Sequence, residues 1–302
     1  MIDWPSYNRS LVRRGEILFS YDFLDTWDSE LARMNENKKG KPFAFPGSFI
    51  LVVGHIRVCF HPPYRQTGGI IKATGKSLPN HPSYGHMCKR INRMNVDITG
   101  SIRTDDDDDD DDIIIAIDST GIKVTNRGQW MFDKWGARNK KKGYLKIHVA
   151  VNIKTKEILA LEVTDEKVHD SRIMRRLVKH VLDSRDGENL RMKSALSDGA
   201  YDSNENFKFL NDKGIEPAIK VRKNSIISSK SNMMRNREVM QQTKDFLKWK
   251  KKKRYGQRWI AETAFSSIKR MFGEHVSAFR FQNMVKEMVL KVSLYNLFTR
   301  LA

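Results

Sequence analysis

Apolar residues after position 112 recur in short runs that have the length of β-strands. Ile113–Ile117 is a continuous apolar run, and Tyr144–Val151 alternates apolar with polar residues. A continuous run indicates a strand buried on both faces, whereas alternation indicates a strand buried on one face. Similar runs bounded by turn residues predict three more strands, at 157–163, 194–196 and 215–221.

Helical patterns fill the gaps between these strands. Asp170 or Ser171 can cap a helix that reaches Leu182, because both side chains accept hydrogen bonds from backbone amides. Asn204–Asp212 predicts a second helix and Tyr255–Phe272 a third. Three strands followed by alternating helices and strands predict an α/β fold, a mixed five-stranded sheet flanked by helices.

The amino-terminal part of the chain shows helical patterns, which predict a small all-α domain over residues 1–104. Its expected helices cover 11–36, 48–60, 64–78 and 84–94. Turn residues separate the last two, and the final one carries Lys89, Arg90, Asn92 and Arg93. This arrangement is compatible with a helix-turn-helix DNA-binding domain, although purely structural helical domains share the pattern.

Eight consecutive aspartates, Asp105–Asp112, separate the two patterns. Adjacent carboxylates repel one another and favour a solvated, extended chain, so we expect a linker here. The predicted parts are therefore the helical domain 1–104, the acidic linker 105–112 and the α/β domain 113–302. An alternative is that the aspartates occupy a basic channel of the free protein.

The 302-residue chain is strongly basic, with 55 Lys and Arg against 36 Asp and Glu and a net charge of +19. Such an excess favours a polyanionic partner, nucleic acid before an anionic membrane. The chain starts without a signal-peptide pattern, and its most apolar window, Phe43–Phe60, is interrupted by Pro, Gly, His and Arg. Cys59 and Cys88 are too few for a disulfide framework. We expect a cytoplasmic, nucleoid-associated protein that binds no membrane.

Acidic residues stand where two predicted strands end. Asp118 ends the first strand and Asp198 follows the fourth. Each alone is typical of turns, but side chains at the carboxyl ends of neighbouring strands converge at one edge of an α/β sheet. If these strands are neighbours, the two carboxylates face each other and Glu262 can reach them from the last helix. Converging carboxylates suit Mg²⁺ or Mn²⁺, and two such ions support in-line displacement at phosphorus.

The last predicted helix combines this glutamate with side chains that can bind DNA. Polar residues recur there at spacings of three, four and seven, namely Tyr255, Arg258, Glu262 and Lys269. They share one helical face, whereas the apolar Ile260, Ala264 and Ile268 lie on another. An isolated stripe of this kind is ordinarily a surface ion-pair network. The two upstream aspartates and the basic charge favour a functional site.

These motifs together resemble DDE-class insertion-sequence transposases, close to the groups numbered four and five. The resemblance covers about residues 113–302 and rests on Asp118-Ser-Thr-Gly121, Tyr144–Val151, Asp198-Gly-Ala-Tyr201 and the Tyr255/Arg258/Glu262/Lys269 set. It implies a ribonuclease H-like domain in which Asp118, Asp198 and Glu262 bind the metal. It also implies that Tyr255, Arg258 and Lys269 contact the DNA of the element ends.

Further basic residues are expected to line the DNA path. They are Arg222, Lys223 and the block Lys248–Arg254, within which we single out Lys250 and Lys251. Each contact with a phosphate adds to the salt dependence of binding. Trp249 can stack on an exposed base, although a Trp in a helix more often packs inside the protein. A solvated charged linker remains the alternative for individual lysines.

The resulting hypothesis is a metal-dependent transposase that acts on double-stranded DNA, at element ends and at the target, as a homodimer. Water first attacks a phosphodiester at the element end, and the freed 3′-hydroxyl then attacks target DNA. Three alternatives stay open: an inactive DNA-binding relative, a metal-dependent nuclease without strand transfer, and a carboxylate-pair hydrolase acting on glycans. The excess of cations argues against the glycan hydrolase.

Overall fold

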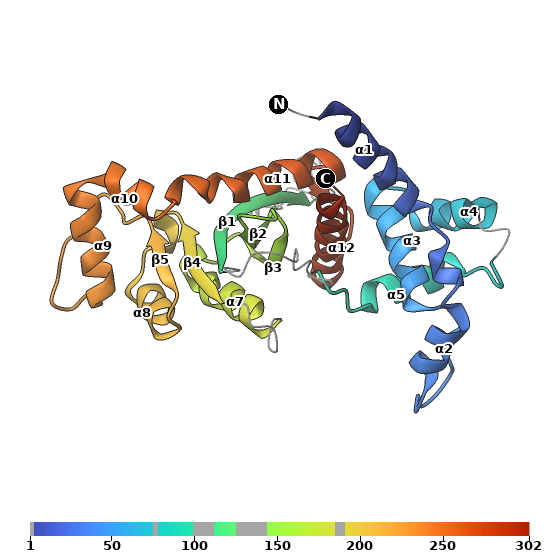
Figure 1. Cartoon of the computed structure of the whole chain (residues 1–302). Helices are drawn as coiled ribbons and strands as arrows, with labels where there is room; N and C mark the ends of the chain where they lie inside the picture. The colour runs from blue at the N-terminus through green and yellow to red at the C-terminus, as the bar shows by residue number, and fades with distance from the viewer. Residues whose placement is uncertain (1–2, 75–77, 99–111, 125–143, 185–190, 302) are drawn as a thin grey trace, which may run out of the picture. The chain divides into compact units, whose positions relative to one another are not determined.

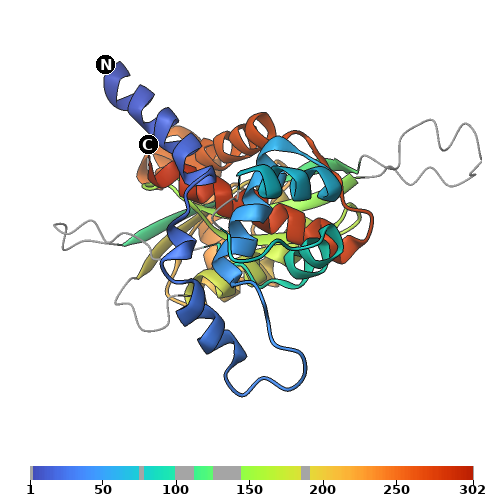
Figure 2. The ribbon, with the colours of Figure 1, turned by 90° about the vertical axis from the view of Figure 1, so that its right-hand side faces the viewer.

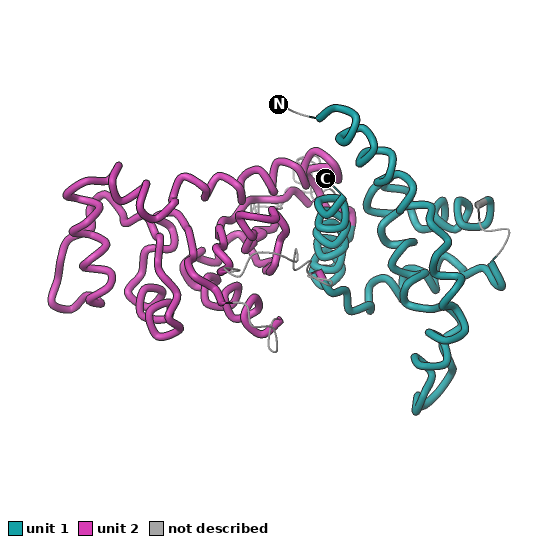
Figure 3. The backbone as a smooth tube through the Cα atoms, viewed as in Figure 1, with its two compact units in different colours: residues 1–97, 278–302 teal, residues 98–277 magenta. Residues whose placement is uncertain are grey.

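The computed structural model of the chain describes residues 3–74, 78–98, 112–124, 144–184 and 191–301. It divides into two compact units (Figure 3). One unit comprises residues 1–97 and 278–302, and the other comprises residues 98–277. The predicted linker lies outside the described residues except for Asp112, whose carboxylate pairs with Lys193 at 2.9 Å. Whether the parts act as DNA-binding domain, linker and catalytic domain stays a prediction.

The second unit contains the predicted mixed sheet, with strands in the order β3-β2-β1-β4-β5. The first three strands along the chain pair in antiparallel fashion, whereas β1–β4 and β4–β5 are parallel. This order and these directions define a ribonuclease H-like sheet, and the α/β prediction is confirmed. The bounds are β1 Ile113–Val124, β2 Tyr144–Asn152, β3 Ile158–Asp165, β4 Met192–Ser197 and β5 Glu216–Ile219.

Strand β1 is longer than its apolar run, so the prediction that it ends at Asp118 is wrong. Its continuation pairs with β2 from Asp118 to Lys123, and this cross-strand pairing sets its length. The far end also pairs with a sixth strand, β6 (His275–Val276), which was not predicted. The expected count of five strands is therefore corrected to six in the part of the chain that the structure describes.

Helices cover both faces of the sheet (Figure 1). Helix α7 (Asp170–Asp183) packs on β2 and β3, and α11 (Trp259–Phe272) packs on β1 and β2. Alternate residues of β1, from Ile113 to Ile117, join the core beneath α7. Because side chains alternate along a strand, Asp118 points to the opposite face, towards α11. The remaining helices are α8 Asn204–Asp212, α9 Met233–Lys244 and α10 Phe246–Lys252, with short 3₁₀ turns η3 Gly199–Tyr201 and η4 Tyr255–Arg258.

The first unit consists of helices, as predicted for the amino-terminal part. They are α1 Trp4–Leu18, η1 Asp22–Leu24, α2 Trp27–Asn35, α3 Gly47–Phe60, α4 Tyr64–Thr74, α5 Tyr84–Arg93 and α12 Phe281–Arg300. The single helix expected over 11–36 is in fact two helices and a 3₁₀ turn. Helix α12, which was not predicted, packs on α3 and α5 and lies beside α3 in both views (Figure 1, Figure 2).

An aromatic cluster forms much of the core of this helical unit. Trp27 and Phe45 each lie against Phe49, with ring centroids 5.4 Å and 5.9 Å apart, and Phe23 lies 5.3 Å from the same ring. These large apolar side chains explain why α2 and α3 pack together although α2 is polar on its outer face. No helix among the described residues is long and apolar enough to cross a membrane.

A buried histidine makes the stability of this unit dependent on pH. His55 on α3 is 6% exposed, and its Nε2 lies 3.3 Å from the hydroxyl of Ser293 on α12. Burial lowers the pKa of His55 from 6.5 to about 4. Between these values the unfolded chain binds a proton that the folded chain does not. Acidification below pH 6.5 therefore destabilises the fold, by up to about 1.4 kcal/mol per pH unit.

Urea unfolding between about pH 7 and about pH 5, in wild type and in His55→Gln, measures this effect. We expect the wild type to lose stability relative to the variant as the pH falls, because Gln does not titrate. Parallel pH dependences of the two proteins would contradict the assignment.

Candidate active site

The sheet register brings the two predicted aspartates together. Ile117 of β1 is the parallel partner of Ser197 of β4, so the next residues along each strand, Asp118 and Asp198, follow the same pair. The condition that their strands are neighbours is met. Asp198 follows the end of β4, and Asp118 lies where β1 passes that end. The amide of Ser119 donates to Asp118 Oδ1 at 2.9 Å.

Asp198 is fixed by the turn that follows it. Its Oδ1 accepts a hydrogen bond from the amide of Ala200 at 2.9 Å, so the aspartate caps the 3₁₀ turn η3. This contact holds the carboxylate at the end of the strand without using its second oxygen. In the motif Asp198-Gly-Ala-Tyr201, the aspartate is therefore the N-cap of the turn that the next three residues form.

Arg258 forms ion pairs with both Asp118 and Glu262. Arg258 Nη1 lies 3.1 Å from Asp118 Oδ2, and the other terminal nitrogen of Arg258 forms a close ion pair with Glu262. Burial raises the pKa of Asp118, an effect that Asp198 and Glu262 reinforce and that Arg258 and the Ser119 amide oppose. Burial alone would lower the pKa of Arg258, but Asp118, Tyr255 and Glu262 raise it. Asp198 and Glu262 thus each lie within electrostatic reach of Asp118.

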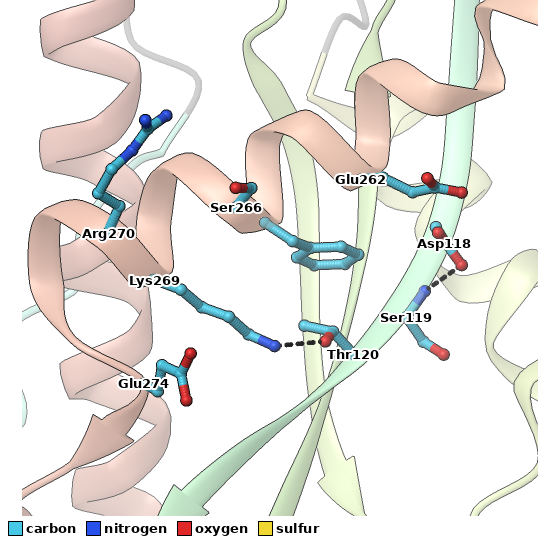
Figure 4. A pocket seen from close by; sticks show the side chains of 9 residues that line it. Asp118, Ser119, Thr120, Glu262, Ser266, Lys269, Arg270 and Glu274 are labelled. Carbon is cyan, nitrogen blue, oxygen red and sulfur yellow. Dashed lines mark hydrogen bonds between the residues drawn. The ribbon is translucent and has the colours of Figure 1, made fainter.

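An open pocket of about 480 Å³ lies between β1 and α11. The side chains of Asp118 and Glu262 approach each other there from the strand and the helix (Figure 4). Lys269, two turns beyond Glu262 on α11, donates to the hydroxyl of Thr120 at 2.8 Å. The lining residues are Asp118, Ser119, Thr120, Glu262, Phe265, Ser266, Lys269, Arg270 and Glu274, and Asp198 stands outside this set.

The carboxylates offer the oxygen donors that hard divalent cations prefer. In this structure the guanidinium of Arg258 supplies positive charge between two of them. Among the described residues, no three His, Cys, Asp or Glu side chains are gathered closely enough to hold a metal ion. The donor chemistry fits a metal, whereas the observed arrangement is held by the arginine.

Tyr255 lies beside this site but is mostly buried. Its ring centroid is 5.0 Å from that of Trp249, and the residue is 8% exposed. Burial raises the pKa of Tyr255 to about 12, and Asp198 and Asp118 add to this effect while Arg258 opposes it. Trp249 itself is 3% exposed, so it packs in the core and is not placed to stack on a base. The four-residue pattern is split, since Tyr255 and Arg258 precede α11 in the turn η4.

The predicted basic DNA path divides into exposed and buried residues. Arg222, Lys250 and Lys251 are exposed, and Arg222 Nε donates to the carbonyl oxygen of Gly199 at 3.2 Å. Lys253 of the same basic block is buried and pairs with Glu238 at 2.8 Å and Glu216 at 2.9 Å. It therefore anchors the segment before α11 and is not available to DNA.

A buried polar group behind the aspartates was not predicted as part of the site. Tyr201 is fully buried, and burial followed by the charges of Asp170, Asp118 and Asp198 raises its pKa well above the usual value. His148 is also buried, and burial lowers its pKa to about 4. Its Nε2 contacts the Thr164 hydroxyl at 2.9 Å. Sequence spacing gives no signal for this grouping, because the sheet register creates it.

A ribonuclease H-like sheet with one acid within β1, another after the end of β4 and a third on the covering helix α11 is typical of polynucleotidyl transferases. Comparison with known families identifies it further. Residues 109–297 match the Transposase DDE domain, and residues 12–127 match a second family model with the same description. The chain belongs to the family of DDE-domain transposases, as predicted, and family members depend on divalent metal ions. The closer assignment to insertion-sequence groups four and five stays a prediction.

Among solved structures, the chain is similar to a piggyBac transposase synaptic complex with hairpin DNA. The sequence identity is 11% and the TM-score is 0.41, over 95% of this chain and 74% of the other. The family match itself excludes the glycan hydrolase alternative.

Proposed function

We propose that this transposase cuts phosphodiester bonds of DNA and that Asp118, Asp198 and Glu262 form its catalytic site. The observation that carries the proposal is the β1–β4 register, which brings Asp118 and Asp198 next to each other on neighbouring strands. Glu262 lies on that helix and shares Arg258 with Asp118. The family match supplies the reaction class, a phosphoryl transfer on DNA.

The same three side chains would hold the divalent metal, Mg²⁺ or Mn²⁺. When bound, such ions activate the attacking oxygen and stabilise the leaving one during in-line displacement at phosphorus. The residues of the chain position the carboxylates and supply their negative charge. The amides of Ser119 and Ala200 each fix one oxygen of an aspartate by a hydrogen bond, and Arg258 pairs with the other oxygen of Asp118.

The cations around the pocket would hold the DNA strand. Lys269 lines the pocket with Asp118 and Glu262, and Arg258 reaches the same carboxylates from η4. We propose that both bind phosphates of the element end, and that Tyr255 positions Arg258 from beneath. Arg222, Lys250 and Lys251 extend this basic surface, and the helical unit adds a separate DNA contact, which a helix-turn-helix would provide. The protein would act as a homodimer on the nucleoid, cutting element ends and joining them to target DNA.

A cleavage assay tests the proposal directly. The substrate is a labelled duplex that carries the inverted repeat flanking the reading frame, incubated with the full chain and Mg²⁺ or Mn²⁺. We expect strand cleavage that leaves a 3′-hydroxyl, joining of that end to a supercoiled plasmid, and complete loss of both products when EDTA removes the metal.

The products separate the remaining alternatives. Cleavage without joining would indicate a nuclease that lacks strand transfer. Binding of the duplex without any cleavage, in either metal, would indicate an inactive DNA-binding relative and would contradict the proposal.

A further inference from the structure

The segment between β5 and α9, residues 222–232, is an irregular loop held from within by a buried acid. Asp202, whose side chain is fully buried, accepts hydrogen bonds from Arg235 Nε at 2.7 Å and Nη2 at 3.0 Å. The same carboxylate accepts from the amide of Arg222 at 3.1 Å and the hydroxyl of Ser225 at 3.0 Å. Burial alone would raise the pKa of Asp202, but these hydrogen bonds hold it below its usual value.

A second clamp closes the far side of the loop. Asn236 on α9 accepts from the amide of Ser228 at 3.2 Å and donates to its carbonyl oxygen at 2.7 Å. The beginning and the middle of the 222–232 loop are thus attached to structured elements. The loop is preorganised, so its exposed side chains project from a fixed frame.

The loop presents positive charge without compensating acids. Residues 217–237 contain six Lys and Arg and no Asp or Glu, and Asp202 neutralises only Arg235 among them. A pocket of about 560 Å³ opens on the loop. Its lining residues are cations, hydroxyls, an amide and one apolar side chain, namely Arg222, Lys223, Asn224, Ser225, Ile226, Ser228, Ser231 and Arg235. This is the donor set of a phosphate-binding surface.

Two adjacent isoleucines stand exposed on the same loop. Ile226 is 74% exposed and Ile227 is 59% exposed. The clamps at Asp202 and Asn236 hold the loop without them, so the folding of the loop does not require these side chains. Apolar side chains beside phosphate-binding cations are the combination with which proteins press on or between base pairs while they grip the backbone.

The loop begins next to the proposed cleavage site. Arg222 Nε donates to the carbonyl oxygen of Gly199, the residue that follows Asp198. A DNA strand held at the carboxylates can therefore continue onto Arg222 and the loop within the same compact unit. Because a phosphodiester backbone is continuous, the cations that follow the site bind the nucleotides flanking the cut.

We propose that the 222–232 loop is a second DNA subsite, which grips flanking phosphates with Arg222 and Lys223 and presses Ile226 and Ile227 against the bases beside the cut. This proposal rests on the proposed function for the position of the cut. The binding of duplex DNA by the loop does not depend on the proposed function.

Two double variants separate the two parts of the subsite, both measured in the full chain without divalent metal. The first is Arg222→Gln/Lys223→Gln, with the exposed pair Lys179→Gln/Lys208→Gln on α7 and α8 as matched control. With a labelled duplex of about 30 base pairs and arbitrary sequence, we expect about tenfold weaker binding. The slope of log affinity against log salt should fall by about two, since each phosphate contact contributes about 0.9. A slope equal to that of the control pair would overturn the phosphate role.

The second variant is Ile226→Ser/Ile227→Ser, with Met240→Ser as control because Met240 is also exposed, at 55%. The probe is the inverted-repeat duplex with 2-aminopurine placed in turn at base pairs flanking the cut. Wild type and control should raise its fluorescence by unstacking a base, and the double variant should not, while its affinity stays within about twofold. Equal fluorescence in all three proteins would overturn the apolar role. If wild type fails to cut this duplex with Mg²⁺ but the salt slopes still differ, the proposed function fails and the subsite stands.

Discussion

Asp198→Ala is expected to abolish strand cleavage while DNA binding persists. Cleavage should fall by at least about a thousandfold, since loss of one metal-holding carboxylate removes several kcal/mol of transition-state stabilisation. Asp118→Ala and Glu262→Ala should have the same effect. Binding should persist because carboxylates repel phosphate and contribute to catalysis through the metal. Single-turnover cleavage of the inverted-repeat duplex, beside gel-shift affinity, measures both quantities.

A matched control separates loss of the site from loss of the fold. Asp212 is an exposed aspartate at the end of α8 in the same unit, and Asp212→Ala should cleave normally. Thermal unfolding of the variants should stay close to wild type, because Asp118 and Asp198 are partly exposed. Cleavage by Asp198→Ala at more than about a tenth of the wild-type rate would show that the carboxylate set is wrong.

The largest expected effect on stability comes from Lys253. Its ammonium is 5% exposed, contacts Glu216 and Glu238, and donates to the carbonyl oxygen of Pro217 at 3.1 Å. Glu238 is 1% exposed and also accepts a hydrogen bond from Trp249. Lys253→Ala leaves the Glu238 carboxylate buried without its cation. We expect a loss of about 3–5 kcal/mol in the free energy of unfolding.

The neighbouring residue provides the control for this effect. Lys252 is exposed at the end of α10, so Lys252→Ala should change stability by less than about 0.5 kcal/mol. Adding Glu238→Gln to Lys253→Ala should restore part of the lost stability, because it removes the stranded charge. Equal urea midpoints for Lys252→Ala and Lys253→Ala would contradict the buried ion pair.

The sequence patterns predicted those features of the site that follow from local order along the chain. Asp118 and Asp198 could be placed together because each follows an apolar run, and such runs form the central strands. The four-residue spacing of Arg258 and Glu262 placed them on one helical face, and the ion pair that is the ordinary interpretation of such a spacing is present in the structure. The buried face of Ile260, Ala264 and Ile268 is confirmed as well.

Features that depend on partners distant in sequence could not be predicted. Strand β1 extends to Val124 because β2 and β6 pair with it, although its own residues beyond Asp118 are polar in part. Lys253 looks like any lysine of a basic block, and its burial follows from Glu216 and Glu238, far from it along the chain. Helix α12 groups with the amino-terminal helices by packing on α3, which no local pattern indicates.

If Arg258 binds a DNA phosphate and the acids bind metal, as proposed, the position of Arg258 between Asp118 and Glu262 couples the two binding events. One guanidinium cannot neutralise both carboxylates and at the same time grip a DNA phosphate, so DNA that engages Arg258 uncovers the acids for metal. Thermodynamic reciprocity then requires that metal on those acids strengthen DNA binding by the same factor. The free enzyme would thus carry its own internal counterion, and a chain without bound DNA would have little affinity for the metal that makes it able to cut.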